Sequence, residues 1–215
     1  MNCFGLVMSM VYEIGLVSTH GTGKTTLAYD IAAELKKKNL TIRVVAELAT
    51  VARERAIPID QKTTLEAQAW ILHRQCAAEL EAKIYNYDVT ICDRTVLDNY
   101  CYLEKAVGAR QEYRRMALEH YAAHPYDRLF YLPVVGKFSS KKRDPDQEFQ
   151  RAIDQRIVAF LAEHNIEYIT LPPERRKWKS LVVQYTLKDL REIEKKKEQE
   201  RRAGMKKWAG SLPEA

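Results

Sequence analysis

Five short apolar runs alternate along this chain with longer segments of helical periodicity. The runs are rich in β-branched, aromatic and other apolar residues, as the strands of a buried sheet are. They cover residues 12–17, 41–46, 89–92, 128–132 and 167–171. Alternation of strands with helices is typical of a parallel sheet wound by helices, so we expect an α/β fold.

A long amphipathic helix is predicted between the second and third of these strands. Thr63 and Glu66 have the spacing of a capping box, which predicts a helix that begins near Thr64 and runs toward Tyr85. Its apolar stripe consists of Leu65, Ala69, Leu72, Cys76, Leu80 and Ile84.

Three polar side chains share one flank of that stripe. At about 100° per residue, Gln68, Gln75 and Glu79 fall on the same side of the helix. As a set they could read the base or ribose of a ligand. The alternative is a semi-exposed polar edge, which such a flank normally carries.

The size of the chain bounds its organisation. A length of 215 residues with 46% hydrophobic content predicts one core, which we place in residues 1–173, followed by a helix and charged tail over 174–215. The sequence has no run of about 18 apolar residues, so no membrane span is predicted. The first eleven residues lack the basic region of a secretion signal, and Met1, Met8 or Met10 could be the start.

The cysteines bear on the cellular compartment, and the charges bear on a possible binding partner. Four cysteines (Cys3, Cys76, Cys92 and Cys101) show no paired spacing, which fits a reducing cytoplasm and no zinc site. The net charge of +6 is concentrated in residues 137–143 and after Arg175. Glutamates interleave with the bases of the tail, so nucleic-acid binding is an alternative that we do not favour.

The strongest chemical signal is the segment STHGTGKT at residues 18–25, between the first strand and an amphipathic helix. Gly21 and Gly23 let the backbone turn its N–H groups around a phosphate, and the following helix adds its dipole. Lys24 is placed to reach the β- and γ-phosphates of ATP, and Thr25 to ligate Mg²⁺. The expected nucleotide-binding set is Ser18, Thr19, His20, Gly21, Thr22, Gly23, Lys24, Thr25 and Thr26.

A second chemical site follows the third strand. Asp93 ends that strand, where a parallel sheet presents side chains to its ligand, and could hold Mg²⁺. Arg94 could grip a phosphate or a reacting oxygen, or it could form a framework contact with Asp93. Asp98 could bind a sugar hydroxyl or stabilise the start of a helix.

Glu47 ends the second strand and should emerge at the same edge of the sheet. A carboxylate there could accept the proton of an attacking hydroxyl. The structural alternative is an ion pair with Arg53 that opens a helix.

A basic, turn-rich segment follows the fourth strand, at about residues 134–147, and leads into a further helix. Such a segment could close over the site as a lid, excluding water and bringing positive charge to the transferred group. Arg143 and Arg151 are the expected phosphate contacts, the latter on the nucleotide side. An ordinary solvated loop is the alternative.

The chain resembles the P-loop nucleoside and nucleotide kinases. The resemblance rests on five features in this order: the phosphate loop, Glu47, the helix that carries Gln68, Asp93-Arg94 and the basic lid. The likeness covers about residues 12–171. It is nearest to the AAA-type ATPase subgroup that includes the nicotinamide riboside kinase domains of bifunctional NAD-biosynthesis proteins. Ser18, where the usual motif has its first glycine, is tolerated in that subgroup.

The resemblance implies a three-layer P-loop NTPase fold, with a five-stranded parallel sheet in the order 2-3-1-4-5. It also implies transfer of the γ-phosphoryl group of ATP to a small nucleoside, nucleotide or nicotinamide riboside-like acceptor. Carried over by position, Glu47 would be the base, Arg94 an acceptor or phosphate contact, and Gln68 a base-reading residue. Arg94-Thr95 resembles deoxynucleoside kinases as much as thymidylate kinases, so the acceptor class stays open.

Two other functions fit the same residues. One is a nucleotide-dependent ATPase or switch, and the other is a polynucleotide kinase, each using the basic lid and tail to bind nucleic acid or a protein. The oligomeric state is open, with a homodimer as one option.

Overall fold

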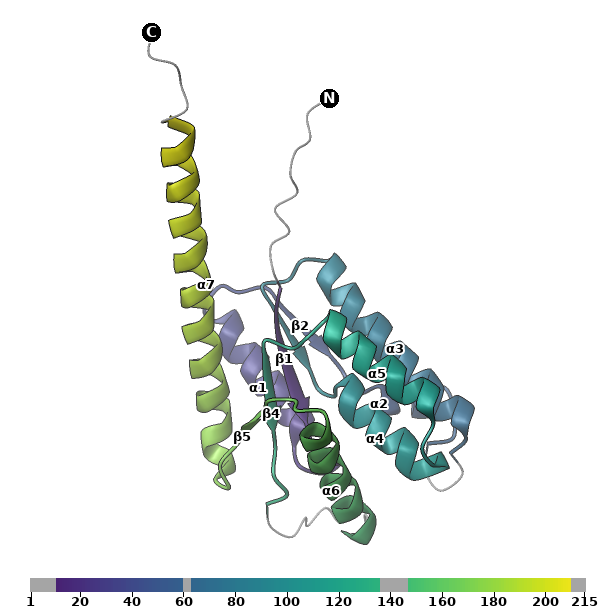
Figure 1. The fold of residues 1–215 in the computed structure, drawn as a ribbon. Coiled ribbons are helices and arrows are strands. Elements are labelled where there is room, and N and C mark those ends of the chain that lie inside the picture. Colours follow the sequence, from purple (N-terminus) through teal and green to yellow (C-terminus); the bar gives the residue numbers. More distant parts are fainter. Residues whose placement is uncertain (1–10, 60–62, 136–146, 210–215) are drawn as a thin grey trace.

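The protein forms a five-stranded parallel sheet with helices on both faces (Figure 1). The computed structural model describes residues 11–59, 63–135 and 147–209, with side chains up to residue 203. The strands are β1 (Tyr12–Val17), β2 (Ile42–Val45), β3 (Val89–Cys92), β4 (Arg128–Tyr131) and β5 (Ile169–Thr170). Their order, β2-β3-β1-β4-β5, confirms the predicted 2-3-1-4-5 arrangement.

Seven α-helices and one short 3-10 helix are present in the described part of the chain. They are α1 (Lys24–Lys36), α2 (Leu48–Glu54), α3 (Leu65–Ile84), α4 (Val96–Val107), α5 (Gln111–Ala123), α6 (Gln147–Glu163), η1 (Arg175–Lys177) and α7 (Trp178–Ala209). None of these helices has the combination of length and apolar sequence that crossing a bilayer requires.

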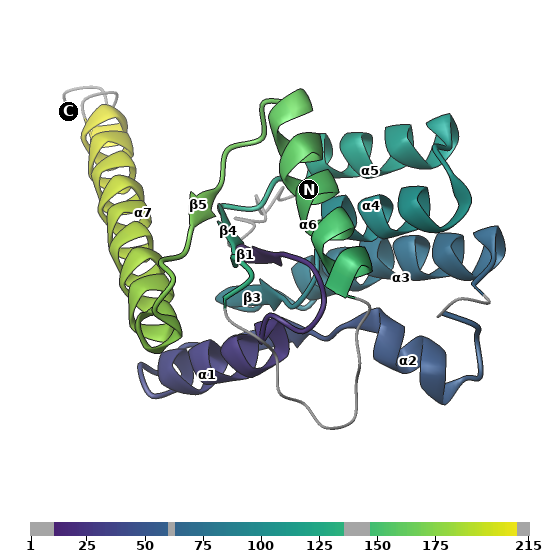
Figure 2. The ribbon, with the colours of Figure 1, turned by 90° about the horizontal axis from the view of Figure 1, so that it is seen from below.

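The sheet separates two apolar cores because successive side chains of a strand point to opposite faces. Tyr12, Ile14 and Leu16 of β1 belong to the core formed with α1 and α7. Val17 belongs to the core on the other face, where α3, α4, α5 and α6 pack. Figure 2 shows these two sets of helices on either side of the strands. The arrangement is the predicted three-layer α/β fold.

The predicted stripe of α3 needs correction. Its N-cap is Thr64, whose side chain accepts a hydrogen bond from the Ala67 amide, and not Thr63. Leu80 and Ile84 are exposed, at 38% and 77%, whereas the polar residues Gln75 and Glu79 are fully buried. The buried face turns toward polar partners on α4, on α5 and beside β3, which make burial of these two side chains tolerable.

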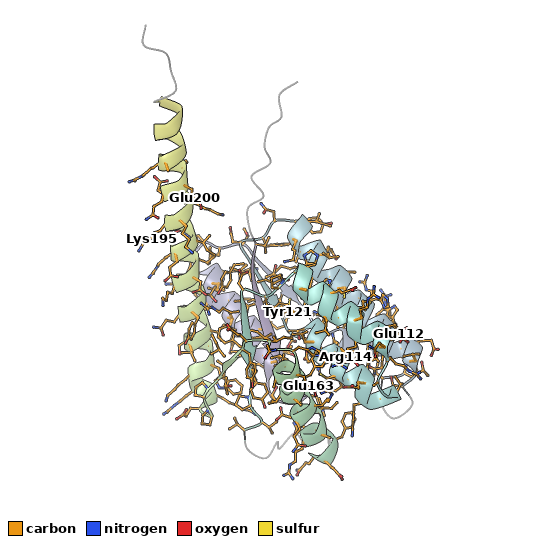
Figure 3. The ribbon with its side chains drawn as sticks, viewed as in Figure 1. Glu112, Arg114, Tyr121, Glu163, Lys195 and Glu200 are labelled. Atoms are coloured by element: carbon orange, nitrogen blue, oxygen red, sulfur yellow. The ribbon has the colours of Figure 1, made fainter. Side chains whose placement is uncertain are left out.

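The C-terminal helix α7 joins the main core at its beginning and leaves it further along. Trp178, Val182 and Val183 pack in the same core as β1 and α1. Later turns extend past the rest of the molecule, where Lys195 and Glu200 project into solvent (Figures 1 and 3). The charge-dense segment predicted in this region is therefore helical.

A polar anchor fixes α7 to the sheet. Asp189 accepts a hydrogen bond of 2.6 Å from the Tyr12 hydroxyl. The Arg128 guanidinium donates to both carboxylate oxygens of Asp189, at 2.6 and 3.1 Å. One carboxylate on α7 therefore connects to two neighbouring strands, β1 and β4.

We expect Asp189→Ala to lower the free energy of unfolding by about 1–3 kcal/mol, because it leaves the buried Tyr12 hydroxyl without its acceptor. Urea unfolding followed by circular dichroism measures the change. Glu192→Ala, at an exposed position of the same helix, is the matched control and should shift the value by no more than about 0.5 kcal/mol. Equal stabilities of the two variants would refute the anchor.

Candidate functional site

The candidate residues meet at the carboxyl edge of the sheet. β1 runs into the phosphate loop, β2 ends just before Glu47, and β3 ends just before Asp93. Val45 of β2 and Gly15 of β1 are both in register with Cys92 of β3, so β2 and β3 end at the same level and β1 runs two residues further into the phosphate loop. The parallel sheet thus brings together residues that lie far apart in the sequence.

The phosphate loop has the conformation that its glycines predict. Gly21 and Gly23 have φ angles of 72° and 96°, in the left-handed region that side chains disfavour. Gly23 is the N-cap of α1, and no side chain caps the helix there. The first N–H groups of α1 and its dipole are therefore directed at the loop, as phosphate binding requires.

Lys24 lies folded over the loop. Its ammonium donates to the carbonyl oxygens of Ser18 and Thr19 at 2.9 and 2.7 Å, and to the Ser18 hydroxyl at 3.1 Å. Burial, together with the nearby Arg94, lowers the pKa of Lys24 to about 8. The Ser18 hydroxyl also lies 2.6 Å from that of Thr22, so the unusual serine is accommodated inside the loop by hydrogen bonds.

Asp93 is the one buried carboxylate of the described residues that has no hydrogen-bond partner on either oxygen. Burial raises the pKa of Asp93 to about 6, against the lowering effects of the nearby Thr25 hydroxyl and Lys24 ammonium. A buried carboxylate of this kind is costly unless a cation or a donor meets it. Asp93 and the hydroxyl of Thr25 therefore fit the oxygen ligands that Mg²⁺ takes.

Arg94 is buried and lies between two carboxylates. Its Nε and Nη2 are each 2.8 Å from Glu47 Oε1, and Nη1 is 3.3 Å from Asp98 Oδ2. The guanidinium carbon lies 4.4 Å from the centre of the Tyr102 ring, a cation–π contact. Burial alone would lower the pKa of Arg94, but Tyr102, Glu47 and Asp98 raise it above its ordinary value. Arg94 thus pairs with Glu47, and the predicted Glu47 to Arg53 ion pair is absent among the ion pairs of the described residues.

Asp98 has a structural role in addition to this ion pair. Asp98 Oδ1 accepts hydrogen bonds of 2.6 Å from both the amide and the hydroxyl of Thr95, which completes a capping box at the start of α4. The carboxylate is fully buried, and burial raises its pKa. These contacts favour the helix-start alternative over direct contact with a sugar hydroxyl.

The two glutamines of α3 differ in their surroundings. Gln75 is fully buried, and its amide nitrogen donates to Glu79 and to the Arg94 carbonyl oxygen. Its contacts favour a supporting role over ligand contact. Gln68 is nearly buried near the start of α3 and donates to the Thr63 hydroxyl at 2.9 Å, so it stays a candidate for base reading.

Three contacts at the site carry no motif and were missed by the sequence patterns. The Tyr102 hydroxyl accepts a 2.7 Å hydrogen bond from the His20 amide, which connects the ring that covers Arg94 to the phosphate loop. Gln150 of α6 donates to the His20 carbonyl oxygen at 2.8 Å. Arg175 of η1 lies beside the loop as well, with Nη1 3.9 Å from the point where a Cβ on Gly23 would stand. Only the basic character of the segment after β5 hinted at the last of these.

The expected lid residues are only partly placed. Arg143 lies outside the described residues. Arg151 is an exposed residue in the first turns of α6, the helix that contributes Gln150 to the phosphate loop. Both therefore stay predicted phosphate contacts.

Solved structures with a similar fold include a NadR protein and two kinases. The chain superposes on a NadR protein in complex with NAD and AMP-PNP with a TM-score of 0.64 at 13% identity, covering 84% of this chain and 49% of that one. It therefore spans about half the length of NadR. A deoxyadenosine kinase from M. mycoides gives a TM-score of 0.55 at 19% identity, over 80% of this chain and 97% of that one. A thymidylate kinase from Ehrlichia chaffeensis gives 0.57 at 15% identity, over 84% and 98%.

The family of the chain is shown by comparison of its sequence with protein-family models. Comparison with curated proteins gives no match. The model of an AAA domain matches residues 14–179, a range that includes the phosphate loop, Glu47 and Asp93-Arg94. This match spans well over half of the sequence and agrees with the superposed folds. The chain therefore belongs to this AAA-domain family and has the fold of the P-loop kinases.

Proposed function

We propose that the protein is an ATP-dependent kinase that transfers the γ-phosphoryl group to a hydroxyl of a small nucleoside-like acceptor. The observation that carries this proposal is the position of Glu47. Its carboxylate is held by Arg94 at the same sheet edge as the phosphate loop, close enough to Lys24 for each to affect the pKa of the other. A carboxylate beside the γ-phosphate position suits transfer to an acceptor hydroxyl.

Each side of the site has its own task. On the nucleotide side, the loop N–H groups and Lys24 bind the triphosphate, and Arg175 supplies further positive charge near Gly23. Thr25 and Asp93 would hold Mg²⁺, which neutralises charge on the β- and γ-phosphates when bound. On the acceptor side, Glu47 orients the hydroxyl and takes its proton as the oxygen attacks phosphorus.

The electrostatics of Glu47 define how it acts. Burial raises its pKa, but Arg94 and Lys24 outweigh burial and lower the pKa below the ordinary value. Glu47 is therefore ionised near neutral pH and is a weak base. Phosphoryl transfer passes through a loose transition state that needs positioning more than early proton removal, so a weak, well-held base suffices.

The charge balance around Arg94 bears on the acceptor class. One guanidinium lies between two carboxylates, Glu47 and Asp98, so its positive charge is already paired within the protein. A phosphate on the acceptor would have to compete with these two carboxylates for Arg94. A neutral or cationic nucleoside, such as a nicotinamide riboside-like compound, therefore fits better than a nucleoside monophosphate.

A panel of acceptors tests the proposal. Nucleosides, nicotinamide riboside and nucleoside monophosphates are each incubated with labelled ATP and Mg²⁺, and phosphorylated products are separated and identified. We expect product from at least one nucleoside-class acceptor, and Lys24→Ala should lower its formation by about 10²- to 10³-fold because the positive charge that stabilises the transferred group is lost. Absence of product from every acceptor, or wild-type turnover in Lys24→Ala at unchanged circular dichroism, would overturn it.

Glu47→Gln separates the catalytic role from nucleotide binding. We expect kcat to fall by about 10²- to 10⁴-fold, because the amide cannot accept the proton, while the Kd for ATP changes little. Steady-state kinetics and titration with a non-hydrolysable ATP analogue give the two values. An unchanged kcat would return Glu47 to a structural role as the partner of Arg94.

The lowered pKa of Lys24 predicts a pH dependence of ATP binding. Below about pH 8 the ammonium is charged and meets the phosphates directly, whereas above it binding must take up a proton. Affinity should therefore fall as pH rises through 8, by up to about tenfold per pH unit. Calorimetric titrations from pH 6.5 to 9.5 measure the slope, and Lys24→Arg, which stays charged, should flatten it. Equal slopes for both proteins would contradict the assignment.

A further inference from the structure

We propose that Glu79 is a positioning residue for the phosphoryl-transfer site, because its buried carboxylate holds, through Gln75 and Tyr126, two backbone groups of the turn that follows Arg94, the Arg94 carbonyl oxygen and the Val96 amide. This inference rests on the proposed kinase function for its kinetic readout. It also has a structural readout that is independent of any activity.

The first half of the argument concerns the turn between β3 and α4. The Arg94 carbonyl oxygen accepts a 2.7 Å hydrogen bond from the Gln75 amide nitrogen. Two residues later, the Val96 amide donates to the Tyr126 hydroxyl at 3.1 Å. The backbone that aims the Arg94 side chain at Glu47 is thus held at two points by side chains from α3 and from the segment before β4.

Both of these side chains end on the same carboxylate. Glu79 Oε1 accepts from the Gln75 amide at 2.8 Å and from the Tyr126 hydroxyl at 2.7 Å. Glu79 Oε2 lies 2.9 Å from His120 Nε2 on α5. Burial alone would lower the pKa of His120, but hydrogen bonds with Cys76 and Glu79 raise it to about 10, so the imidazole is charged and donates. Glu79 is fully buried, and its three hydrogen-bonding neighbours, Gln75, Tyr126 and His120, all act as donors.

The donor directions are fixed by chemistry. Burial and the neighbouring Glu79 raise the pKa of Tyr126 well above its ordinary value, so the phenol keeps its proton. The phenol donates this proton to Glu79 and is left to accept from the Val96 amide. The Gln75 amide nitrogen likewise has its two N–H groups for its two acceptors, Glu79 and Arg94.

The fold makes room for this cluster. A Cβ on Gly15, in the central strand β1, would stand 3.0 Å from both the Tyr126 ring and the Thr95 methyl group. The glycine therefore leaves room for the tyrosine to reach the turn across the face of the sheet that α3 and α4 cover. A buried carboxylate costs stability unless its oxygens are paired, and here two of its three partners, Gln75 and Tyr126, reach the turn that follows Asp93 and Arg94.

The test removes the two links one at a time. Gln75→Met and Tyr126→Phe keep the side-chain volume and delete the hydrogen bonds to Arg94 and Val96. We expect kcat to fall by about 10- to 100-fold in each, since a small displacement of a catalytic group suffices for such a loss. The KM for ATP should change by less than about threefold, because the phosphate loop is on another element. Glu79→Gln keeps a carbonyl oxygen for both links and should retain more turnover than Glu79→Leu.

The structural readout is the Nε–H signal of Arg94 in ¹⁵N NMR spectra, identified by its loss in Arg94→Lys. It should shift in Gln75→Met and Tyr126→Phe and stay in place in Glu81→Gln, an exposed position of the same helix that serves as the matched control. If Glu79→Leu does not fold, the two single-link variants still decide the question.

The outcomes separate the two proposals. If the wild-type protein phosphorylates no acceptor but the Arg94 signal shifts as expected, the kinase proposal fails and the positional role of Glu79 stands. If kcat per folded molecule equals the wild-type value in both variants, or if the Arg94 signal is unmoved in both, Glu79 only stabilises the fold and the inference is overturned.

Discussion

The ion pair between Arg94 and Glu47 is the interaction on which the arrangement of the site depends. The guanidinium is buried, and a buried charge is tolerated only when partners surround it. Those partners come from the end of β2, from α4 through Asp98, and from the ring of Tyr102, which in turn contacts the phosphate loop. Removing one partner of such a group typically costs about 3–5 kcal/mol. The carboxyl ends of β2 and β3 and the first turns of α4 are thereby held at fixed positions relative to the loop.

The nucleotide side and the acceptor side of the site differ in how far their polar groups are satisfied. Glu47 and Asp98 have their donors within the protein, whereas both oxygens of Asp93 lack one and the pKa of Lys24 is lowered by burial. A triphosphate with its cation would supply a positive charge beside the Asp93 carboxylate and a negative charge beside the Lys24 ammonium. Because buried charges must be paired, we expect the acceptor side to be rigid without ligand. On the nucleotide side, we expect ligand binding to raise the free energy of unfolding.

The sequence patterns predict those parts of the fold that depend on local periodicity, and they are silent where burial depends on distant partners. The strands, their common edge and the phosphate loop follow from apolar runs and short motifs. Helical periodicity instead assigns Gln75 and Glu79 to a polar flank and Ile84 to the core, the reverse of what the structure has for all three. The reversal requires Tyr126, 47 residues from Glu79, as a hydrogen-bond donor, and no pattern within one helix contains that information. The contacts of Arg175 have the same long-range character.

The helix α7 belongs to the nucleotide side of the fold, although the family match ends just after its first residues, at residue 179. At its start, Arg175 donates to the Val135 carbonyl oxygen, lies over the ring of Trp178 at 5.5 Å and approaches the phosphate loop. Three turns later, Asp189 binds the hydroxyl of Tyr12, the first residue of β1. The strand that leads into the phosphate loop is thus anchored to α7 at its first residue, and Arg175 of η1, just before α7, lies near the loop that follows the strand. The docking of α7 at Asp189 therefore contributes to where Arg175, three residues before the helix, stands relative to the phosphate loop.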